Sequence, residues 1–381
     1  MKATDIFKDK NFINCLKYNT FDDNEYYVKI FNTVNEIIEK NINKVTYINC
    51  IEHWITSIEG IHIFINLKKL YLSINKIKKI PNKIGNLKNL KELWLVNNKL
   101  QNLPEEIDKL KNLKKLYLSY NQIQKLPNEI VKLTNLKELY LSHNQLKELP
   151  KEIGKLKNLK ELSLSNNQIE KLPSKIGELN KLKILDLSDN QLQYLPKGIW
   201  KLENLKILKL SKNQIQEIPE EIGNLINLER LNLNNNKIQQ LPKEIWNLKK
   251  LEDLDLSSNN IKEIPKEIEK LENLRILNLE NNQLQWLPKE ILKLNNYLDR
   301  IRLEEAFDLD NLKQDPEELF YILQKLEKKK TNKEKNILTP ESLDYLKTKV
   351  YPILEEKIKE KYIITDLKQI KDNFNLNNLK F

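Results

Sequence analysis

The sequence repeats itself every 23 residues, and this period constrains the fold more than any other feature. An asparagine recurs at that step from Asn75 to Asn282, and a proline recurs at the same step from Pro81 to Pro288. Leucines precede each asparagine by eight, five and three residues, as they do before Asn98. Self-similarity at a fixed period is typical of a repeat architecture in which each unit packs on its neighbours.

Each unit begins with a short strand. The segment Leu-x-x-Leu-x-Leu alternates apolar and polar positions near its end, which indicates a strand with one buried face. Such strands are stable beside copies of themselves, so the units should stack into a parallel sheet with strands about 4.8 Å apart. The asparagine ends the strand, and its amide can form a ladder of bonds to backbone groups that the turn leaves unpaired. The Leu-Pro-x-x-Ile step then starts a return path, where proline suits a short helix or 3₁₀ turn.

Residues 149–169 resemble the typical leucine-rich repeat, since they read Leu-Pro-Lys-Glu-Ile-Gly-Lys-Leu-Lys-Asn-Leu-Lys-Glu-Leu-Ser-Leu-Ser-Asn-Asn-Gln-Ile. Similar units occur in bacterial repeat proteins and in intracellular Ras-associated repeat proteins of plants and animals. The resemblance covers about 67–294. It implies an α/β fold, a curved solenoid whose concave parallel sheet binds proteins, and it does not name the partner.

The N-terminal end departs from the regular repeat. A degenerate unit begins at Val45, 22 residues before the next one, and places His53 where the ladder asparagine would stand. This unit is similar to internalin-type repeats, and the upstream segment 7–12 resembles the helical cap that precedes them. We therefore predict a helical cap over 1–44 and a solenoid over 45–307.

The C-terminal end of the array should be an eleventh strand that begins one residue late, at Leu298. Ala306 replaces its asparagine, so the ladder should stop there. We predict that residues 308–381 form a helical cap over the open end of the sheet, or a small helical module.

Two helix starts support this prediction. Asp315 and Thr339 each stand as an N-cap before a proline, followed by acidic residues. Pro352 is predicted to break the second of these helices. The lysines at 328–330, continuing to Lys335, are interpreted as a solvated linker.

Candidate binding residues lie at the outward positions of the strands, between the leucines. The residue between the second and third leucines is aromatic in four consecutive units and polar in the next six; the four aromatic residues are Tyr71, Trp94, Tyr117 and Tyr140. Stacked at strand spacing, they form a stripe roughly 15 Å long. The stripe would be widened by Tyr120 and His143.

Tyrosine and tryptophan are enriched at binding hot spots, because they bury a large area with few rotatable bonds. We therefore predict that these six residues contact a partner. The alternative is that aromatic residues favour strands and that neighbouring repeats arose by duplication.

A second outward row is basic. The residue after the first leucine is a lysine in seven successive units: Lys68, Lys91, Lys114, Lys137, Lys160, Lys183 and Lys206. Glu229 and Glu252 reverse the sign in the next two units. Such a row could steer an acidic partner surface. The simpler interpretation is a solvated, repeated position in a chain with 61 lysines and four arginines.

The net charge of +11 lies on the repeats, since the net charge is −2 over 1–66, +12 over 67–307 and +1 over 308–381. The bias towards lysine, asparagine and isoleucine suggests an AT-rich genome, which raises basic charge without a functional cause. The excess is dispersed lysine with almost no arginine, a pattern that does not favour nucleic-acid binding.

Catalysis finds little support in the sequence. The three histidines (His53, His62 and His143) form no metal-binding motif, and no phosphate loop or nucleophile elbow occurs. Asp186 and Asp255 lie three strands apart, roughly 14 Å, which is too far for a carboxylate pair. Ubiquitin-ligase effectors that carry such repeats need a nucleophilic cysteine, and the C-terminal 74 residues contain none.

We therefore predict a non-enzymatic protein–protein interaction module, a monomer without cofactor or metal. A bacterial effector or a GTPase-associated regulatory scaffold is the alternative.

A cytoplasmic location is the expectation from the sequence. No stretch approaches 18 consecutive apolar residues, and the first residues carry charges where a signal peptide would be apolar. Cys15 and Cys50 are few for a secreted chain of this length, and they can pair only if the fold brings them together. Non-classical export as an effector stays open.

Overall fold

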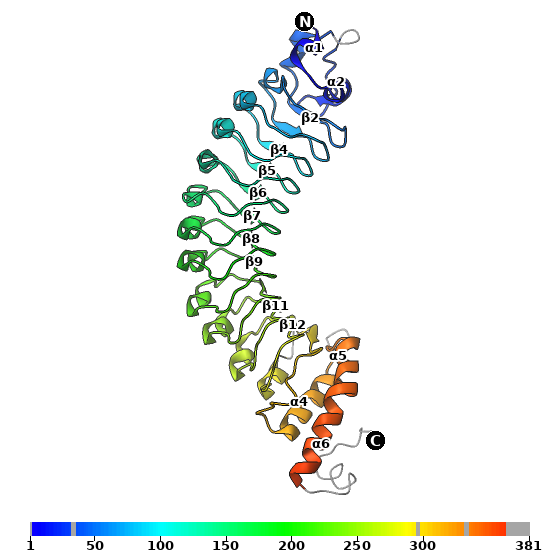
Figure 1. The fold of residues 1–381 in the computed structure, drawn as a ribbon, viewed down its shortest axis with the longest axis vertical. Helices are drawn as coiled ribbons and strands as arrows, with labels where there is room; N and C mark the ends of the chain where they lie inside the picture. The colour runs from blue at the N-terminus through cyan, green and yellow to red at the C-terminus, as the bar shows by residue number, and fades with distance from the viewer. Residues whose placement is uncertain (1, 32–35, 295–297, 331–334, 363–381) are drawn as a thin grey trace. The chain divides into compact units, whose positions relative to one another are not determined.

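The computed structural model describes residues 2–31, 36–294, 298–330 and 335–362. It divides into two compact units, the first made of 1–215 and 221–230 and the second of 216–220 and 231–381. Each unit is described by itself below. In both, every repeat contributes one short strand and one return segment (Figure 1).

The strands follow one another in the order of the sequence. In the first unit, β1 pairs antiparallel with β2, and the strands after it are parallel. Its strands are β1 (Thr20–Phe21), β2 (Tyr47–Asn49), β3 (Lys69–Tyr71), β4 (Glu92–Trp94), β5 (Lys115–Tyr117), β6 (Glu138–Tyr140), β7 (Glu161–Ser163), β8 (Ile184–Asp186) and β9 (Ile207–Lys209). Strand β10 (Arg230–Asn232) lies at the division, and the second unit holds β11 (Asp253–Asp255), β12 (Ile276–Asn278) and β13 (Arg300–Arg302).

The return segments are 3₁₀ turns on the side opposite the strands (Figure 1). They are η1 (Ile61–Ile63), η2 (Asn82–Asn86), η3 (Glu105–Lys109), η4 (Asn128–Lys132), η5 (Ile153–Lys155), η6 (Ser174–Glu178), η7 (Lys197–Lys201), η8 (Glu220–Asn224), η9 (Lys243–Asn247), η10 (Lys266–Lys270) and η11 (Lys289–Lys293). In most of them the repeated proline is the residue before the turn, as Pro104 is before η3 with φ −70°. The return turns pack closely, since a Cβ on Gly177 would overlap the carbonyl oxygen of Gly198 in the next turn.

The interior of each unit is a stack of leucine and isoleucine side chains, and the predicted asparagine ladder is confirmed. Asn167 shows the pattern. Its Nδ2 donates to the carbonyl oxygens of Leu141 and Leu164, both at 3.0 Å, and its Oδ1 accepts from the backbone nitrogen of Leu146 at 3.0 Å. One amide therefore joins two consecutive coils and satisfies backbone groups inside a buried turn.

The N-terminal cap consists of α1 (Ala3–Ile6), α2 (Lys10–Leu16) and α3 (Glu39–Ile42). Asp9 caps α2 by accepting from the backbone nitrogen of Phe12, and its second oxygen accepts from Thr56 N and Thr56 Oγ1 at 2.6 and 2.5 Å. These bonds, together with burial that acts in the opposite direction, leave the pKa of Asp9 below its usual value. One carboxylate thus fastens the cap to the first coil.

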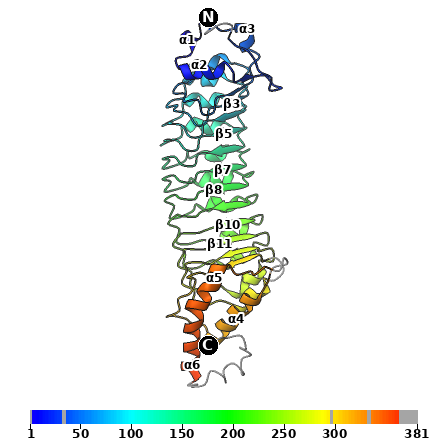
Figure 2. The same ribbon diagram turned by 90° about the vertical axis from the view of Figure 1, so that its right-hand side faces the viewer.

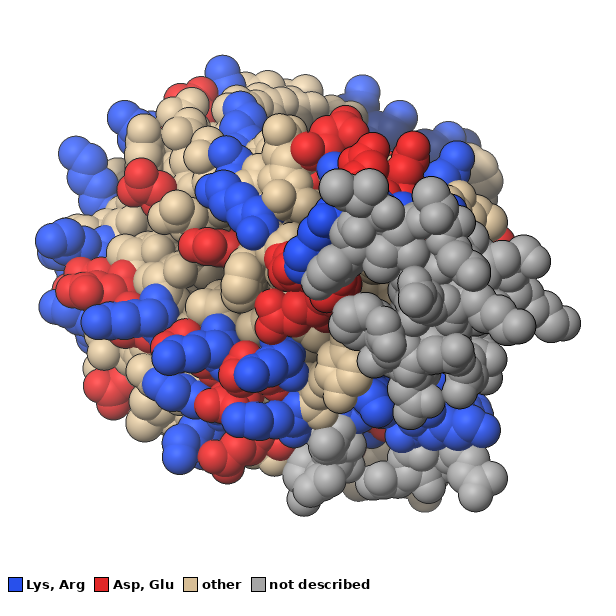
Figure 3. All heavy atoms as spheres, turned by 90° about the horizontal axis from the view of Figure 1, so that it is seen from below, with Lys and Arg blue, Asp and Glu red and all other residues tan. Residues whose placement is uncertain are grey.

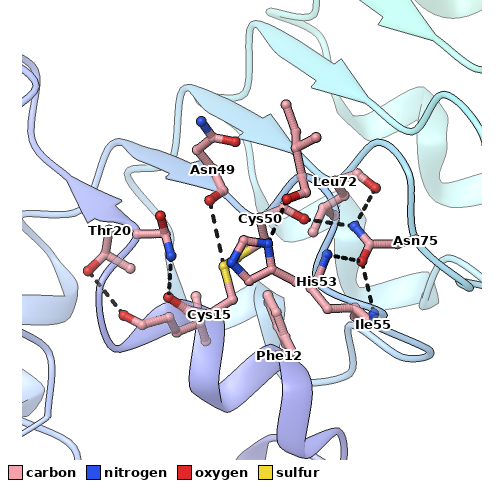
Figure 4. The surroundings of a disulfide bond; sticks show 12 residues. Phe12, Cys15, Thr20, Asn49, Cys50, His53, Ile55, Leu72 and Asn75 are labelled. Atoms are coloured by element: carbon pink, nitrogen blue, oxygen red, sulfur yellow. Dashed lines mark hydrogen bonds between the residues drawn. A yellow bond between two sulfur atoms is a disulfide. The ribbon is translucent and has the colours of Figure 1, made fainter.

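A disulfide joins the cap to the sheet, between Cys15 on α2 and Cys50 just after β2, with the Cα atoms 5.8 Å apart (Figure 4). Beside it, His53 occupies the slot of the ladder asparagine, as predicted. Its Nδ1 lies 2.6 Å from the carbonyl oxygen of Ile51, and its backbone nitrogen donates to Asn75 Oδ1 at 3.1 Å. The histidine therefore serves its own turn and is a structural residue.

The C-terminal helices are α4 (Pro316–Lys328), α5 (Pro340–Tyr345) and α6 (Tyr351–Tyr362). The predicted caps Asp315 and Thr339 are in place. The prediction that Pro352 breaks a helix is wrong. A π-turn, Leu346–Val350, connects α5 to α6, and the Tyr351 nitrogen donates to the Leu346 carbonyl. Pro352 is then the second residue of α6, and the chain stays helical on both sides of it; π-bulges are one of the devices by which a helix adapts where its regular hydrogen bonds are interrupted.

These helices close the edge of the second unit. The backbone nitrogen of Ile301 in β13 donates to Ile337 at 2.7 Å, and that of Leu303 donates to Ser342 Oγ at 2.9 Å. Figure 2 shows α5 and α6 running along this unit, on the face where its strands lie. An edge strand that would otherwise offer free donors is thereby paired.

The prediction of a solvated linker from residue 328 to Lys335 is wrong for Lys329. Residues 331–334 lie outside the described residues. Lys329, the residue that follows α4, is half-buried, and its Nζ lies 2.9 Å from the carbonyl oxygen of Leu292. Burial lowers its pKa to about 8. None of the described helices is long and apolar enough to cross a membrane.

Candidate binding surface

The four predicted outward aromatic residues lie side by side on β3 to β6. The register of the sheet pairs Tyr71 with Trp94, Trp94 with Tyr117, and Tyr117 with Tyr140. Their ring centroids are 4.1, 5.1 and 4.7 Å apart, and the first two pairs are stacked. All four side chains are half-buried, because each ring covers its neighbour. The surface therefore presents mainly ring edges, in place of the freely exposed side chains that the sequence suggested.

Two further aromatic residues extend this row, and sequence reasoning missed both. Tyr47 on β2 packs edge-on against Tyr71 with centroids 5.0 Å apart, and Phe21 on β1 lies 5.4 Å from Tyr47. Tyr47 occupies the other outward position of its strand, in register with Lys69. The six residues Phe21, Tyr47, Tyr71, Trp94, Tyr117 and Tyr140 are called the aromatic ribbon below.

Three of the four tyrosines of the ribbon are held by glutamates on the following strands. Tyr71 Oη donates to Glu92 at 2.7 Å, and Tyr117 and Tyr140 donate in the same way to Glu138 and Glu161. Burial first, and then the bond to the carboxylate, raise the pKa of each of these tyrosines well above its usual range. The rings are thus fixed in orientation before any partner arrives.

Trp94 is the exception within the ribbon. The position on the next strand that would have to accept its indole N–H is occupied by Lys115. A lysine ammonium offers no acceptor, and Lys115 is paired with Glu138 at 3.3 Å. Among the described residues, Trp94 Nε1 is buried without a hydrogen-bond partner. The indole nitrogens of Trp200 and Trp246, in the return turns η7 and η9, are buried in the same way, so the unpaired N–H by itself does not distinguish Trp94 from a structural tryptophan.

The predicted flanking residues form a separate pair. Tyr120 and His143 stack with ring centroids 4.0 Å apart at an interplanar angle of 12°. Both have positive φ, 57° and 54°, at the turn position that several other units fill with asparagine or aspartate. Left-handed backbone is less favourable for tyrosine than for asparagine. The same positive φ occurs at this position in the other units, at Ile74 and Lys212 among them, so it belongs to the repeat. Tyr120 stands there with 53% of its surface exposed.

The ribbon ends at Tyr140, where the sheet face becomes polar. Ser163 follows in register, and its hydroxyl lies 2.6 Å from that of Ser142. Asp186 on the next strand bonds the backbone nitrogen of Ser188 and lies 3.5 Å from Lys209. In the described part of the chain, no group of three or more His, Cys, Asp or Glu side chains is placed to hold a metal ion.

Models of protein families match most of the repeat array. The leucine-rich repeat region matches residues 42–144, 130–209 and 182–255, and the two-copy leucine-rich repeat matches 249–289. These matches cover more than half of the chain. The chain belongs to the leucine-rich repeat proteins. The predicted fold class, an α/β leucine-rich repeat solenoid with helical ends, is therefore confirmed.

Solved structures agree with this assignment. A leucine-rich repeat protein of Leptospira interrogans is 32% identical over 83% of this chain and 96% of its own, with a TM-score of 0.49. An internalin (inlF) of Listeria monocytogenes is 22% identical over 90% of this chain and 94% of its own, with a TM-score of 0.69. The predicted resemblance to bacterial leucine-rich repeat proteins is confirmed.

The plant peptide hormone receptor RGFR1, solved in complex with RGF2, is 26% identical over 71% of this chain and 54% of its own, with a TM-score of 0.55. A search of curated proteins found no match.

Proposed function

We propose that this leucine-rich repeat protein is a non-enzymatic interaction module that binds a protein partner on the outward face of its first unit. The aromatic ribbon is the contact surface, flanked by Tyr120 and His143. The observation that carries the proposal is the continuous row of six rings in contact on one face, which ends where the outward residues become polar. A structural neighbour, the plant receptor RGFR1, is described in complex with RGF2, which supports peptide or protein binding as a use of this fold.

The ribbon is a preorganised contact surface. Stacked rings lose few rotamers on binding, and the tyrosine hydroxyls are already fixed by Glu92, Glu138 and Glu161. Binding therefore costs less side-chain entropy than it would on a flexible surface. A bacterial effector target or a Ras-like GTPase would be one case of this partner class.

The compartment proposed for this function is an oxidising one. The sequence favoured the cytoplasm, in part because two cysteines are few. Since the fold joins Cys15 to Cys50, and disulfides are rare in reducing cytosol, we place the protein outside it. Thiol trapping in the native cells, followed by mass spectrometry of the joined peptides, tests this. Two free thiols in the native protein would rule it out.

The binding proposal is tested with a native partner, recovered by affinity capture and then titrated calorimetrically. Trp94→Ala removes the central ring and should cost roughly 2 kcal/mol or more of affinity, about 30-fold. Trp94→Phe keeps a ring in the stack and should retain most of the affinity. Asn232→Ala changes the equivalent outward position on β10 and should cost little. If Trp94→Ala binds as tightly as the wild type, the ribbon is not the contact surface.

A further inference from the structure

The first unit carries a row of lysines beside the aromatic ribbon. Seven successive repeats, from Lys68 to Lys206, have a lysine two positions before the buried leucine of their strand. The backbone of these lysines is bonded from one coil to the next, since the nitrogen of Lys114 donates to the carbonyl of Lys91 at 2.7 Å. The same bond links Lys137 to Lys114 and Lys160 to Lys137. The side chains therefore originate on adjacent coils, about 4.8 Å apart.

The two ends of the row are neutralised and its middle is not. Lys68 pairs with Asp23 at 2.5 Å, and Lys206 pairs with Glu229 at 2.5 Å. Between them lie five exposed lysines that form no ion pair within the described ranges, and these are called the lysine row: Lys91, Lys114, Lys137, Lys160 and Lys183.

Five like charges on adjacent strands repel one another, and salt screens that repulsion only in part. The repeat fold does not require them. In the second unit the same position holds Glu252, Arg275 and Asp299, and the last two form an ion pair at 2.6 Å. A lysine-rich composition explains why lysine is frequent. It does not explain why acidic partners occur at both ends of the row and are missing along its middle.

We propose that the lysine row binds an acidic polypeptide segment of the partner, and this rests on the proposed binding at the aromatic ribbon. Lys91, Lys114 and Lys137 stand directly before the ribbon strands β4, β5 and β6, and the other two lysines of the row precede the next two strands. One segment can therefore place its carboxylates on the lysines and its apolar side chains on the ring edges. Charge complementarity then raises the rate of association and fixes the orientation of the segment.

An acidic polypeptide fits this surface better than a nucleic acid does. The row contains lysine alone, whereas the bidentate recognition of phosphate favours arginine. Glutamates follow the lysines directly in the chain at Glu92, Glu138 and Glu161. A continuous phosphate backbone would meet these negative charges in three of the repeats, while separate Asp and Glu side chains can be placed between them.

The experiment measures binding of a fluorescent polyglutamate peptide to the full chain by anisotropy at several salt concentrations. The test variant carries Lys114→Glu, Lys137→Glu and Lys160→Glu. The matched control carries Lys125→Glu, Lys147→Glu and Lys171→Glu, which are exposed lysines of the return segments with the same change in net charge. We expect the test variant to bind at least about tenfold more weakly and the control to change less than about threefold.

Three outcomes decide the proposal. Equal losses in the two variants would show binding by net charge alone and would overturn it. A single-stranded oligonucleotide that binds the wild type more tightly than polyglutamate does, in the same buffer, would overturn the choice of an acidic polypeptide. If the test variant loses polyglutamate but keeps full affinity for the native partner, the row is not used there. In that case Trp94→Ala still tests the ribbon independently.

Discussion

The first and second units have the same kind of interior and differ in their outward residues. In both, the ladder asparagine makes the same bonds, as shown by Asn167 in the first and Asn259 in the second. Outside, the first unit carries stacked rings and unpaired lysines. At the corresponding positions the second unit carries Asp255, which bonds Ser257, and Arg302, which lies 3.6 Å from Glu280. Figure 3, a view from the end of the C-terminal helices, shows basic side chains lying next to acidic ones.

This difference separates the residues that make the fold from those that can recognise a partner. Repeats with aromatic and with polar outward residues stack in the same register, so the interior sets the stability and leaves the surface free to vary. The outward residues of the second unit are bonded to one another or to the turn behind them. In the first unit, β1 to β6 leave ring edges available and the lysine row leaves ammonium groups available, whereas Asp186 and Lys209 on β8 and β9 are bonded as in the second unit.

The largest expected effect comes from removing the closure of the second unit. Truncation after Asp308 deletes the partners of the Ile301 and Leu303 nitrogens and exposes the last apolar coil. We expect aggregation or fraying of the second unit, measured by light scattering and hydrogen exchange, with the first unit protected as before. A truncated chain that stays monomeric and melts unchanged would show that residues 309–381 are a separate module.

The disulfide should matter to the first unit alone. Cys15→Ser opens a loop with a sequence separation of 35 residues, for which loop-closure entropy predicts a loss of roughly 4 kcal/mol. Chemical denaturation of the variant, with and without reductant, measures this loss. The reduced wild type is the control and should match the variant. A similar loss of hydrogen-exchange protection in the second unit would contradict the independence of the two regions.

The ladder should contribute equally in the two units. Asn167→Leu and Asn259→Leu should each destabilise by about 1–3 kcal/mol, because buried backbone groups of two coils lose their partner. Lys160→Ala, on the surface of the same repeat as Asn167, should cost less than about 0.5 kcal/mol. Urea denaturation of the three variants provides the measurement. Equal stability of Asn167→Leu and Lys160→Ala would remove the ladder argument.

The smallest effect concerns the tyrosines of the ribbon at high pH. Because the folded pKa of Tyr117 is raised, its contribution to stability is complete below about pH 10, the unfolded pKa. It is lost as the pH rises above that value. Tyr117→Phe should cost about 0.5–1.5 kcal/mol at neutral pH and should remove one late-titrating phenol from the absorbance at alkaline pH. Glu138→Gln should lower the pKa of Tyr117. If the Tyr117 titration were unchanged in Glu138→Gln, the Tyr117–Glu138 bond would be contradicted.

The second unit supplies the comparison for this titration. Tyr351 donates to Glu327 at 3.0 Å, and burial followed by that carboxylate raises its pKa well above the usual range. Its late titration should persist in Tyr117→Phe and in Glu138→Gln.

The sequence by itself determined the repeats. The strand, the ladder and the return turn of each unit depend on residues within that unit and on its nearest neighbours. A strict 23-residue period therefore predicted the parallel register and the row from Tyr71 to Tyr140. The apolar spacing of the degenerate unit that begins at Val45 predicted the slot of His53. Strand β13 was predicted too, one residue late, because its leucine spacing is intact.

The tertiary structure decided what depends on residues that do not repeat. It joined Cys15 to Cys50 and placed Phe21 at the end of the ribbon through the antiparallel pairing of β1 with β2, which the repeat period does not predict. It also carried the helix past Pro352 with a π-turn. The tyrosine–glutamate bonds were hidden for a related reason. Each bond joins the aromatic position of one strand to a different outward position of the next strand. The repeat period shows only which residues occupy equivalent positions, whereas the packed sheet shows which side chains are close enough to bond.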